Sequence, residues 1–243
     1  MLRAIATVSL AAAAVLVFSR PAFSHTAALD VEICDVPADA ALGLGDYPTA
    51  IQLHRRILRS HPYDALAHYH LGFAYGMVGR ISEEIDQYRK AASLGLDKWD
   101  LFLNLGLAYA ERGELSSAGA VLEHAAGLAP EKPETHFNLA LVYEREQRLD
   151  AALKESTIAR QLQPEDPDSI NTNAILCAET GDFASARNLW TRLIQIAPRY
   201  SPARANLAIL QTVVNKVPVS LNRTATPQVT RESKSMTGEL GRN

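Results

Sequence analysis

The chain has 243 residues, of which 47% are hydrophobic and 21% charged, a composition typical of a soluble globular protein with one sizeable core. The net charge of −3 is unevenly distributed, because residues 25–215 hold 17 basic and 25 acidic side chains while both ends are basic. So acidic a body should repel phosphate backbones, which argues against nucleic-acid binding. Cys34 and Cys177 are too few and too far apart in sequence for a disulfide framework or a thiolate metal site.

Residues 1–24 have the layout of a secretory signal peptide. A short basic start is followed by 15 weakly polar to apolar residues at 4–18, and Ala22, Phe23 and Ser24 place small residues around a cleavage site. An uncleaved membrane anchor is the alternative, but it needs about 20 apolar residues. We therefore expect cleavage after Ser24, a short N-terminal segment at 25–30, and an exported, periplasmic protein without stable membrane insertion.

A 34-residue period runs through the next part of the chain. Several columns of identical or similar residues keep this spacing: Gly45, Gly79, Gly113 and Gly181; Pro62, Pro130, Pro164 and Pro198; Gly72, Gly106, Ala140, Ala174 and Ala208; Tyr75, Tyr109 and Tyr143; and Ala50, Ala118, Ala152 and Ala186. Each unit contains two apolar-periodic stretches of helical spacing, such as 135–146 and 150–162. The glycine column predicts the turn between the two helices, because glycine adopts positive φ at little cost.

These columns carry a resemblance to a known family. In one unit, the predicted first helix contains Phe102, Leu105, Gly106 and Tyr109. The residues that follow at the family's spacing are Gly113, Ala118, Leu122, Ala125 and Pro130, and the whole pattern resembles the tetratricopeptide repeat. The resemblance covers residues 31–215 and implies an all-α fold, an α-solenoid of antiparallel helix pairs. We expect units at 31–64, 65–98, 99–132, 133–166 and 167–200, a partial capping unit at 201–215, and a disordered tail at 216–243.

Three departures from the family pattern bear on the structure. The first unit lacks the usual first-helix pattern, which predicts a short or irregular opening helix. Glu84 stands where alanine is expected, so it must turn outward or find a partner. Gly119 and Gly127 lie inside one predicted helix, and each costs about 0.5–1 kcal/mol relative to alanine.

No catalytic or cofactor motif is present, so the sequence predicts neither catalytic residues nor a cofactor. His54, His61, His68 and His70 invite a metal hypothesis, but His68 and His70 are two apart on a predicted helix and face different ways. His54 and His68 fall on core-facing columns, where hydrogen bonds, for example to Glu84, would satisfy them. We therefore predict no metal site, and we expect Cys177 to be a small buried side chain that cannot reach Cys34.

The resemblance implies that the first helix of every unit lines a concave surface that binds partners. Positions five, six and nine of each unit should face this groove. The candidate partner-binding residues are Tyr69, His70, Phe73, Leu103, Asn104, Leu107, Phe137, Asn138, Leu141, Asn171, Ile175, Asn206 and Ile209. They form an apolar ribbon beside a ladder of side-chain amides, which suits an extended peptide or an amphipathic helix. No lysine stands at these positions, so a clamp for a terminal carboxylate is not predicted.

An exposed apolar ribbon requires something to cover it. A client protein or peptide, a second copy of the chain, or the chain's own tail could do so, and homo-oligomers are therefore possible. The sequence favours a non-enzymatic, exported scaffold for protein–protein interactions. The alternative is a self-assembling structural spacer whose groove receives another copy.

Overall fold

The computed structural model describes residues 34–216, and this part of the chain is built from helices with no strand. The helices are α1 (Val36–Gly43), α2 (Tyr47–Ser60), α3 (Ala65–Met77), α4 (Ile81–Ser93), α5 (Trp99–Arg112), α6 (Leu115–Leu128), α7 (Pro133–Arg145), α8 (Leu149–Leu162), α9 (Pro167–Glu179), α10 (Phe183–Ile196) and α11 (Ser201–Lys216). The expected signal peptide, the segment at 25–30 and the tail from residue 217 lie outside the described residues. Among the residues described, no helix combines the length and apolar character needed to cross a bilayer.

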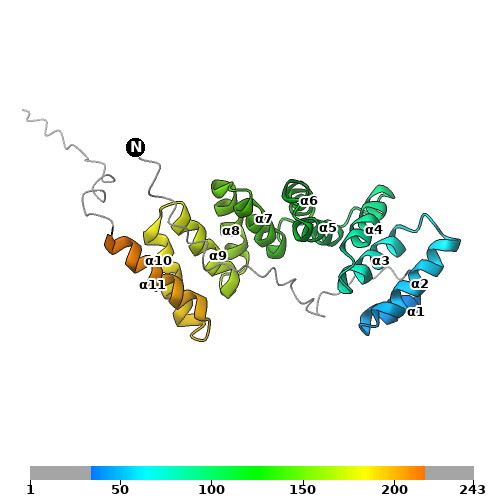
Figure 1. The fold of residues 1–243 in the computed structure, drawn as a ribbon, viewed down its shortest axis with the longest axis horizontal. Helices are drawn as coiled ribbons and strands as arrows, with labels where there is room; N and C mark the ends of the chain where they lie inside the picture. The colour runs from blue at the N-terminus through cyan, green and yellow to red at the C-terminus, as the bar shows by residue number, and fades with distance from the viewer. Residues whose placement is uncertain (1–33, 217–243) are drawn as a thin grey trace, which may run out of the picture.

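The helices pack as consecutive pairs that stack in a row. Each odd-numbered helix packs on the even-numbered helix that follows it, and each pair packs on the next, from α1–α2 at one end to α11 at the other (Figure 1). This arrangement confirms the predicted all-α solenoid. The opening helix α1 has eight residues, against 13 or more in the later helices, in agreement with the short first helix expected from its sequence.

The turns within the pairs follow the predicted glycine column. Gly45, Gly79, Gly113 and Gly181 have φ between 75° and 90°. The fourth unit has Gln147 at the corresponding place, with φ of 61°, and it is the one non-glycine residue in the described range with positive φ. The turn geometry is therefore conserved across the units even where the residue that adopts it easily is missing.

Small residues let the two helices of a pair cross closely. An added Cβ at Gly72 would lie 2.7 Å from the Tyr88 ring, and one at Gly106 would lie 2.6 Å from Cγ of Leu122. Tyr88 and Leu122 are almost completely buried. The large side chain on the second helix thus occupies the space that glycine leaves on the first, which fixes the distance between the helices.

Glu84 shows how one departure from the family pattern is accommodated. Its side chain does not turn outward, since the residue is only 3% exposed. Its carboxylate lies against Gly76, where any Cβ would overlap it, and the corresponding residues of the third and fifth units are Ala110 and Ala178. The loss of a methyl group on α3 therefore makes room for the larger side chain on α4.

Candidate functional site

The first helices of the units lie on the inner side of the solenoid. Contacts join α1 to α3, α3 to α5, α5 to α7 and α9 to α11, whereas successive second helices approach one another less closely. The odd-numbered helices therefore occupy the shorter arc of the curve. Positions five, six and nine of each unit lie on these helices, as the sequence predicts.

The inner face offers less accessible apolar surface than the sequence suggests. Most of the predicted groove residues are only 5–8% exposed: Tyr69, His70, Leu103, Asn104, Asn138, Leu141, Asn171 and Asn206. The half-buried ones are Phe73, Leu107, Phe137, Ile175 and Ile209. At position five, Tyr69, Leu103 and Asn171 are buried, whereas Phe137 is half-buried. The continuous apolar ribbon expected from the sequence is reduced to these separate half-buried side chains.

The predicted amide ladder is engaged within the protein. The amide of Asn104 donates to the Tyr69 hydroxyl at 3.3 Å, and the amide of Asn206 donates to Oδ1 of Asn171 at 3.0 Å. Both bonds join position six of one unit to position five of the unit before it. For Asn138, the residue at position five of the preceding unit is Leu103, whose side chain cannot accept a hydrogen bond. The Asn138 amide donates instead to the Glu134 carbonyl of its own helix at 2.7 Å. Asn104 and Asn206 therefore join successive units, and each of the three amides uses one of its two N–H donors within the protein.

The half-buried side chains differ in how well they are packed. Phe73 meets the Tyr47 ring edge-on, with centroids 6.3 Å apart, and both Leu107 and Ile175 pack against core clusters. Phe137 and Ile209 belong to none of the core clusters in the described part of the chain. Phe137 is the larger of the two, and it lies near the middle of the solenoid on α7. It is therefore a large inner-face side chain that is half-buried and that no core cluster of the described residues includes.

Two carboxylates lie at the C-terminal ends of the neighbouring first helices α7 and α9. Burial and the negative charge of Glu179 raise the pKa of Glu144 to about 7, and burial also raises the pKa of Glu179. Glu144 is near the end of α7 and Glu179 is the last residue of α9. Carboxylates are unfavourable at helix C-termini, where the helix dipole is negative. Because its pKa is about 7, Glu144 is substantially protonated near neutral pH, unlike an ordinary carboxylate.

A cluster of ligand-type side chains lies in the first two units. Cys34 precedes α1, His54 is on α2 and His70 is on α3, and one ligand atom from each lies within 4.8 Å of the others. Asp39 joins them from α1, with Oδ1 2.7 Å from Nδ1 of His70 and 3.7 Å from Nε2 of His54. Its other oxygen accepts from the Cys34 backbone N–H at 3.0 Å.

The four histidines considered in the sequence separate into two groups. His61 is exposed, and His68 is held by Gln87 at 2.7 Å and by the Pro62 carbonyl at 3.1 Å, so neither joins the cluster. His68 and His70 face different ways, as predicted. The expectation that His54 is satisfied by hydrogen bonds is wrong, because neither of its ring nitrogens has a hydrogen-bond partner among the described residues.

The environment of the cluster disfavours added charge. Burial, followed by repulsion from His70, lowers the pKa of His54 to about 4. Burial together with Asp64 and Asp39 raises the pKa of the Cys34 thiol to about 12. At neutral pH the His54 imidazole is therefore neutral, and the thiol of Cys34 is protonated and donates to Oδ2 of Asp64 at 3.6 Å.

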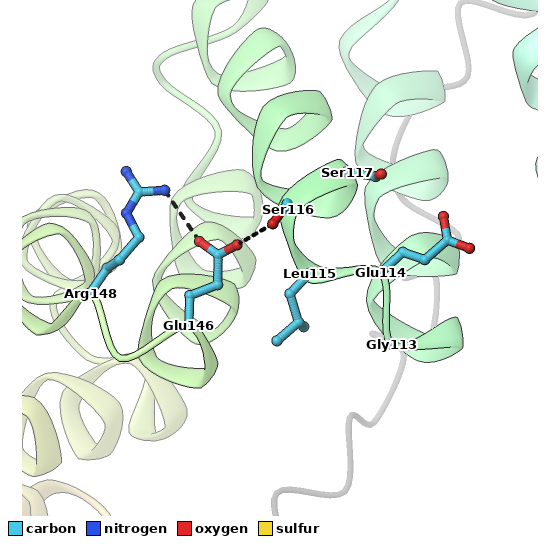
Figure 2. Close-up of a pocket in the computed structure, with 7 residues that line it drawn as sticks. All are labelled: Gly113, Glu114, Leu115, Ser116, Ser117, Glu146 and Arg148. Atoms are coloured by element: carbon cyan, nitrogen blue, oxygen red, sulfur yellow. Dashed lines mark hydrogen bonds and ion pairs between the residues drawn. The ribbon is translucent and has the colours of Figure 1, made fainter.

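A shallow hollow lies on the surface between the start of α6 and the α7–α8 turn (Figure 2). Figure 2 shows Glu146 between Ser116 and Arg148, which donate to its two oxygens at 3.1 and 3.2 Å. The single central carboxylate is thus already paired on both sides. Glu114, the other carboxylate that lines the hollow, pairs with Arg112 outside it.

Comparison with protein families identifies the architecture. A family model described as tetratricopeptide repeat matches residues 38–97 and 103–167, about half of the chain. The chain belongs to the tetratricopeptide repeat (TPR) family. No curated protein matches it. The TPR fold suggests a scaffold for protein–protein interactions, and proteins of this family are typically non-enzymatic.

Solved structures of other TPR proteins share the fold. YrrB, described as a TPR protein with an unusual peptide-binding site, is 22% identical over 70% of this chain and 87% of its own, with a TM-score of 0.65. MamA from Desulfovibrio magneticus RS-1 is 18% identical over 68% of this chain and 93% of its own, with a TM-score of 0.63. A TPR protein from Parabacteroides merdae ATCC 43184 is 20% identical over 74% and 72%, with a TM-score of 0.65. At these identities the likeness concerns the fold alone.

The sequence interpretation missed the N-terminal cluster because it weighed the histidines of the first two units without Asp39 or Cys34. The 34-residue register places Asp39 at position nine of the first unit, on the inner face next to His70. Cys34 was set aside with Cys177, because two cysteines so far apart predicted neither a disulfide framework nor a thiolate site. Cys177 is buried on α9, and both cysteines are free thiols. Applying position nine of the groove to the irregular first unit would have pointed to the meeting of Asp39 and His70.

Proposed function

We propose that this TPR protein is an exported, periplasmic, non-enzymatic scaffold that binds an extended peptide or an amphipathic helix on its inner face. The observation that carries the proposal is Phe137, a half-buried phenylalanine on a first helix that packs into none of the core clusters of the described residues. YrrB provides a parallel, because it combines the same fold with a peptide-binding site. The N-terminal segment at 1–24, with its basic start and apolar run, supports export.

Recognition depends chiefly on apolar side chains. Asn104, Asn138 and Asn206 are almost fully buried, and one N–H of each amide is bonded within the solenoid, which limits what they can offer a partner. Phe73, Leu107, Phe137 and Ile175 keep part of their surface and lie on successive first helices. A partner side chain that buries the remaining surface of one such residue gains about 1 kcal/mol or more.

The test replaces Phe137 with serine and measures capture of partners from a periplasmic extract. Leu162→Ser is the matched control, since Leu162 is a partly exposed apolar residue at the end of a second helix. We expect Phe137→Ser to lose the captured protein and Leu162→Ser to retain it. Leu141 is unsuitable for this test, because it is only 5% exposed and its truncation would destabilise the fold. Equal capture by both variants contradicts the proposal.

Export and self-assembly are tested separately. Mass spectrometry of the protein from a periplasmic fraction should find a chain beginning at His25. Recovery from the cytoplasm with residues 1–24 attached contradicts export. In sedimentation velocity the scaffold should remain a monomer over a wide concentration range, whereas the spacer alternative requires association that Phe137→Ser abolishes.

A further inference from the structure

The cluster at the start of the solenoid contains buried polar atoms that the protein does not satisfy. Both ring nitrogens of His54 are inaccessible to water and have no hydrogen-bond partner among the described residues. Nδ1 of His70 and Oδ1 of Asp39 are equally buried, but they lie 2.7 Å apart and can therefore pair with each other. Unpaired buried polar groups destabilise a fold, so such a group normally has a partner.

His136 shows that burial alone does not explain these atoms. It is a buried histidine at the start of α7, and its two ring nitrogens are 2.8 Å from Glu155 and 2.9 Å from the Pro130 carbonyl. His54 is more deeply buried, and Oδ1 of Asp39 is 3.7 Å from its Nε2, too far for a hydrogen bond. Its ring is instead edge-on to that of His70, with centroids 5.3 Å apart.

We propose that Cys34, His54 and His70 together bind one divalent transition-metal ion, and that zinc is the ion that suits them best. One ligand atom from each lies within 4.8 Å of the others. Ligand atoms around tetrahedral zinc are about 3.4–3.6 Å apart, from zinc–nitrogen bonds of about 2.0–2.1 Å and zinc–sulfur bonds of about 2.3 Å. A movement of about 1 Å, mostly of side chains, therefore closes the site.

The donor set indicates the class of ion. One thiol and two imidazoles are borderline-soft donors, which select zinc and its neighbours over magnesium or calcium. Oδ2 of Asp64 lies 3.6 Å from the sulfur of Cys34, and Oδ2 of Asp39 accepts from the Cys34 backbone N–H, so negative charge that favours a dication lies beside the site. Asp39 acts as the positioning carboxylate, because its Oδ1 lies beside both imidazoles and its Oδ2 holds the Cys34 backbone.

The ion would join three successive elements. Cys34 precedes the eight-residue helix α1, and the two histidines come from α2 and α3. The first unit ends the stack and has a neighbour on one side alone, so it has fewer packing contacts than an internal unit. Metal binding would therefore fasten the short first helix to the second unit.

The test uses the full chain, kept reduced and stripped of metal with a chelator, and titrates it with zinc chloride by calorimetry. We expect one ion per chain. Cys34→Ser and His70→Gln should each weaken binding by more than about 100-fold, and Asp39→Asn by about 10- to 100-fold. His61→Gln is the matched control and should bind as the wild type does, since His61 is exposed and outside the cluster. Failure of the wild-type chain to bind zinc overturns the proposal, as does binding that survives both Cys34→Ser and His70→Gln.

Cobalt(II) provides a readout that identifies the thiolate ligand. The wild-type chain should show a thiolate-to-cobalt charge-transfer band in the near ultraviolet, and Cys34→Ser should lack it while keeping its helical circular dichroism. Cys34 lies outside the helices and is half-buried, so this variant decides the question even if His70→Gln does not fold. A charge-transfer band that persists in Cys34→Ser overturns the assignment.

Discussion

The close crossing of α5 and α6 can be tested with a single methyl group. Gly106→Ala would place a Cβ 2.6 Å from Cγ and 2.8 Å from Cδ2 of Leu122, whereas carbon atoms in good contact are about 3.5–4.0 Å apart. Leu122 is fully buried and branched at the contacting carbon, so it cannot move aside freely. Overpacking of this kind costs about 1–3 kcal/mol, offset by about 1 kcal/mol from the higher helix propensity of alanine.

Gly119→Ala on α6 is the matched control. Gly119 is also buried inside a helix, but its added Cβ would meet Val142 and Tyr143 at 3.7 and 3.8 Å, which is ordinary contact. The propensity gain is common to both variants, so the difference between them isolates the packing cost. We expect Gly119→Ala to stabilise the protein by about 1 kcal/mol and Gly106→Ala to be less stable than that by about 1–3 kcal/mol.

Urea unfolding followed by far-ultraviolet circular dichroism measures both free energies. The double variant Gly106→Ala with Leu122→Ala should be more stable than the sum of the single changes predicts, because the added methyl then fills part of the space that leucine leaves. Equal stabilisation by Gly106→Ala and Gly119→Ala would refute the reasoning.

Three further predictions follow from the turn, the ladder and the paired carboxylates. Gln147→Gly should stabilise the protein by about 0.5–1 kcal/mol in urea unfolding, because Gln147 has φ of 61°, and a loss of stability would contradict this. Asn171→Leu should cost about 2–4 kcal/mol by the same measurement, because Nε1 of Trp190 and Nδ2 of Asn206 both donate to Asn171 at 3.0 Å; a cost below about 0.5 kcal/mol would count against it. Burial and Glu179 raise the folded-state pKa of Glu144 to about 7 from an ordinary 4.5, so between these values the folded state binds more protons than the unfolded state. The stability of the wild type relative to Glu144→Gln should therefore fall as the pH rises from about 4.5 through 7. Equal dependence of stability on pH in the two proteins would refute this prediction.

The architecture could be predicted because its causes recur along the chain. Each turn needs a residue that adopts positive φ, and Gly45, Gly79, Gly113 and Gly181 appear at the required spacing. Each crossing needs a small residue, and the column that contains Gly106 provides it. Such local requirements leave a periodic trace in the sequence.

The accessibility of the inner face could not be predicted in the same way. Whether position five is open depends on how closely successive units stack, and that spacing is set by contacts about 35 residues apart, such as Asn104 with Tyr69. A single-unit pattern does not contain this distance. The burial of Leu103 and Leu141, and the use of the amides inside the solenoid, therefore became visible only in the structure.

The packing of Glu84 against Gly76 could be predicted from the sequence only in part. Glu84 departs from the alanine column, and Gly76 stands on the other helix of the same pair, at a position where two other units have alanine. Comparing columns in pairs would have suggested that a missing methyl on one helix makes room for a carboxylate on the other. Considering each column separately indicated only that Glu84 was unusual.

Photo-crosslinking from position 137 in living cells examines partner binding at its proposed location. A photoreactive phenylalanine analogue in place of Phe137 lies on the inner helix α7, and the same analogue in place of Leu162 lies at the end of the second helix α8. Irradiation should attach a different protein or peptide to position 137 and leave position 162 unmodified. Absence of an adduct at 137, or the same adducts at both positions, would show that the inner face is not where this TPR protein binds its partner.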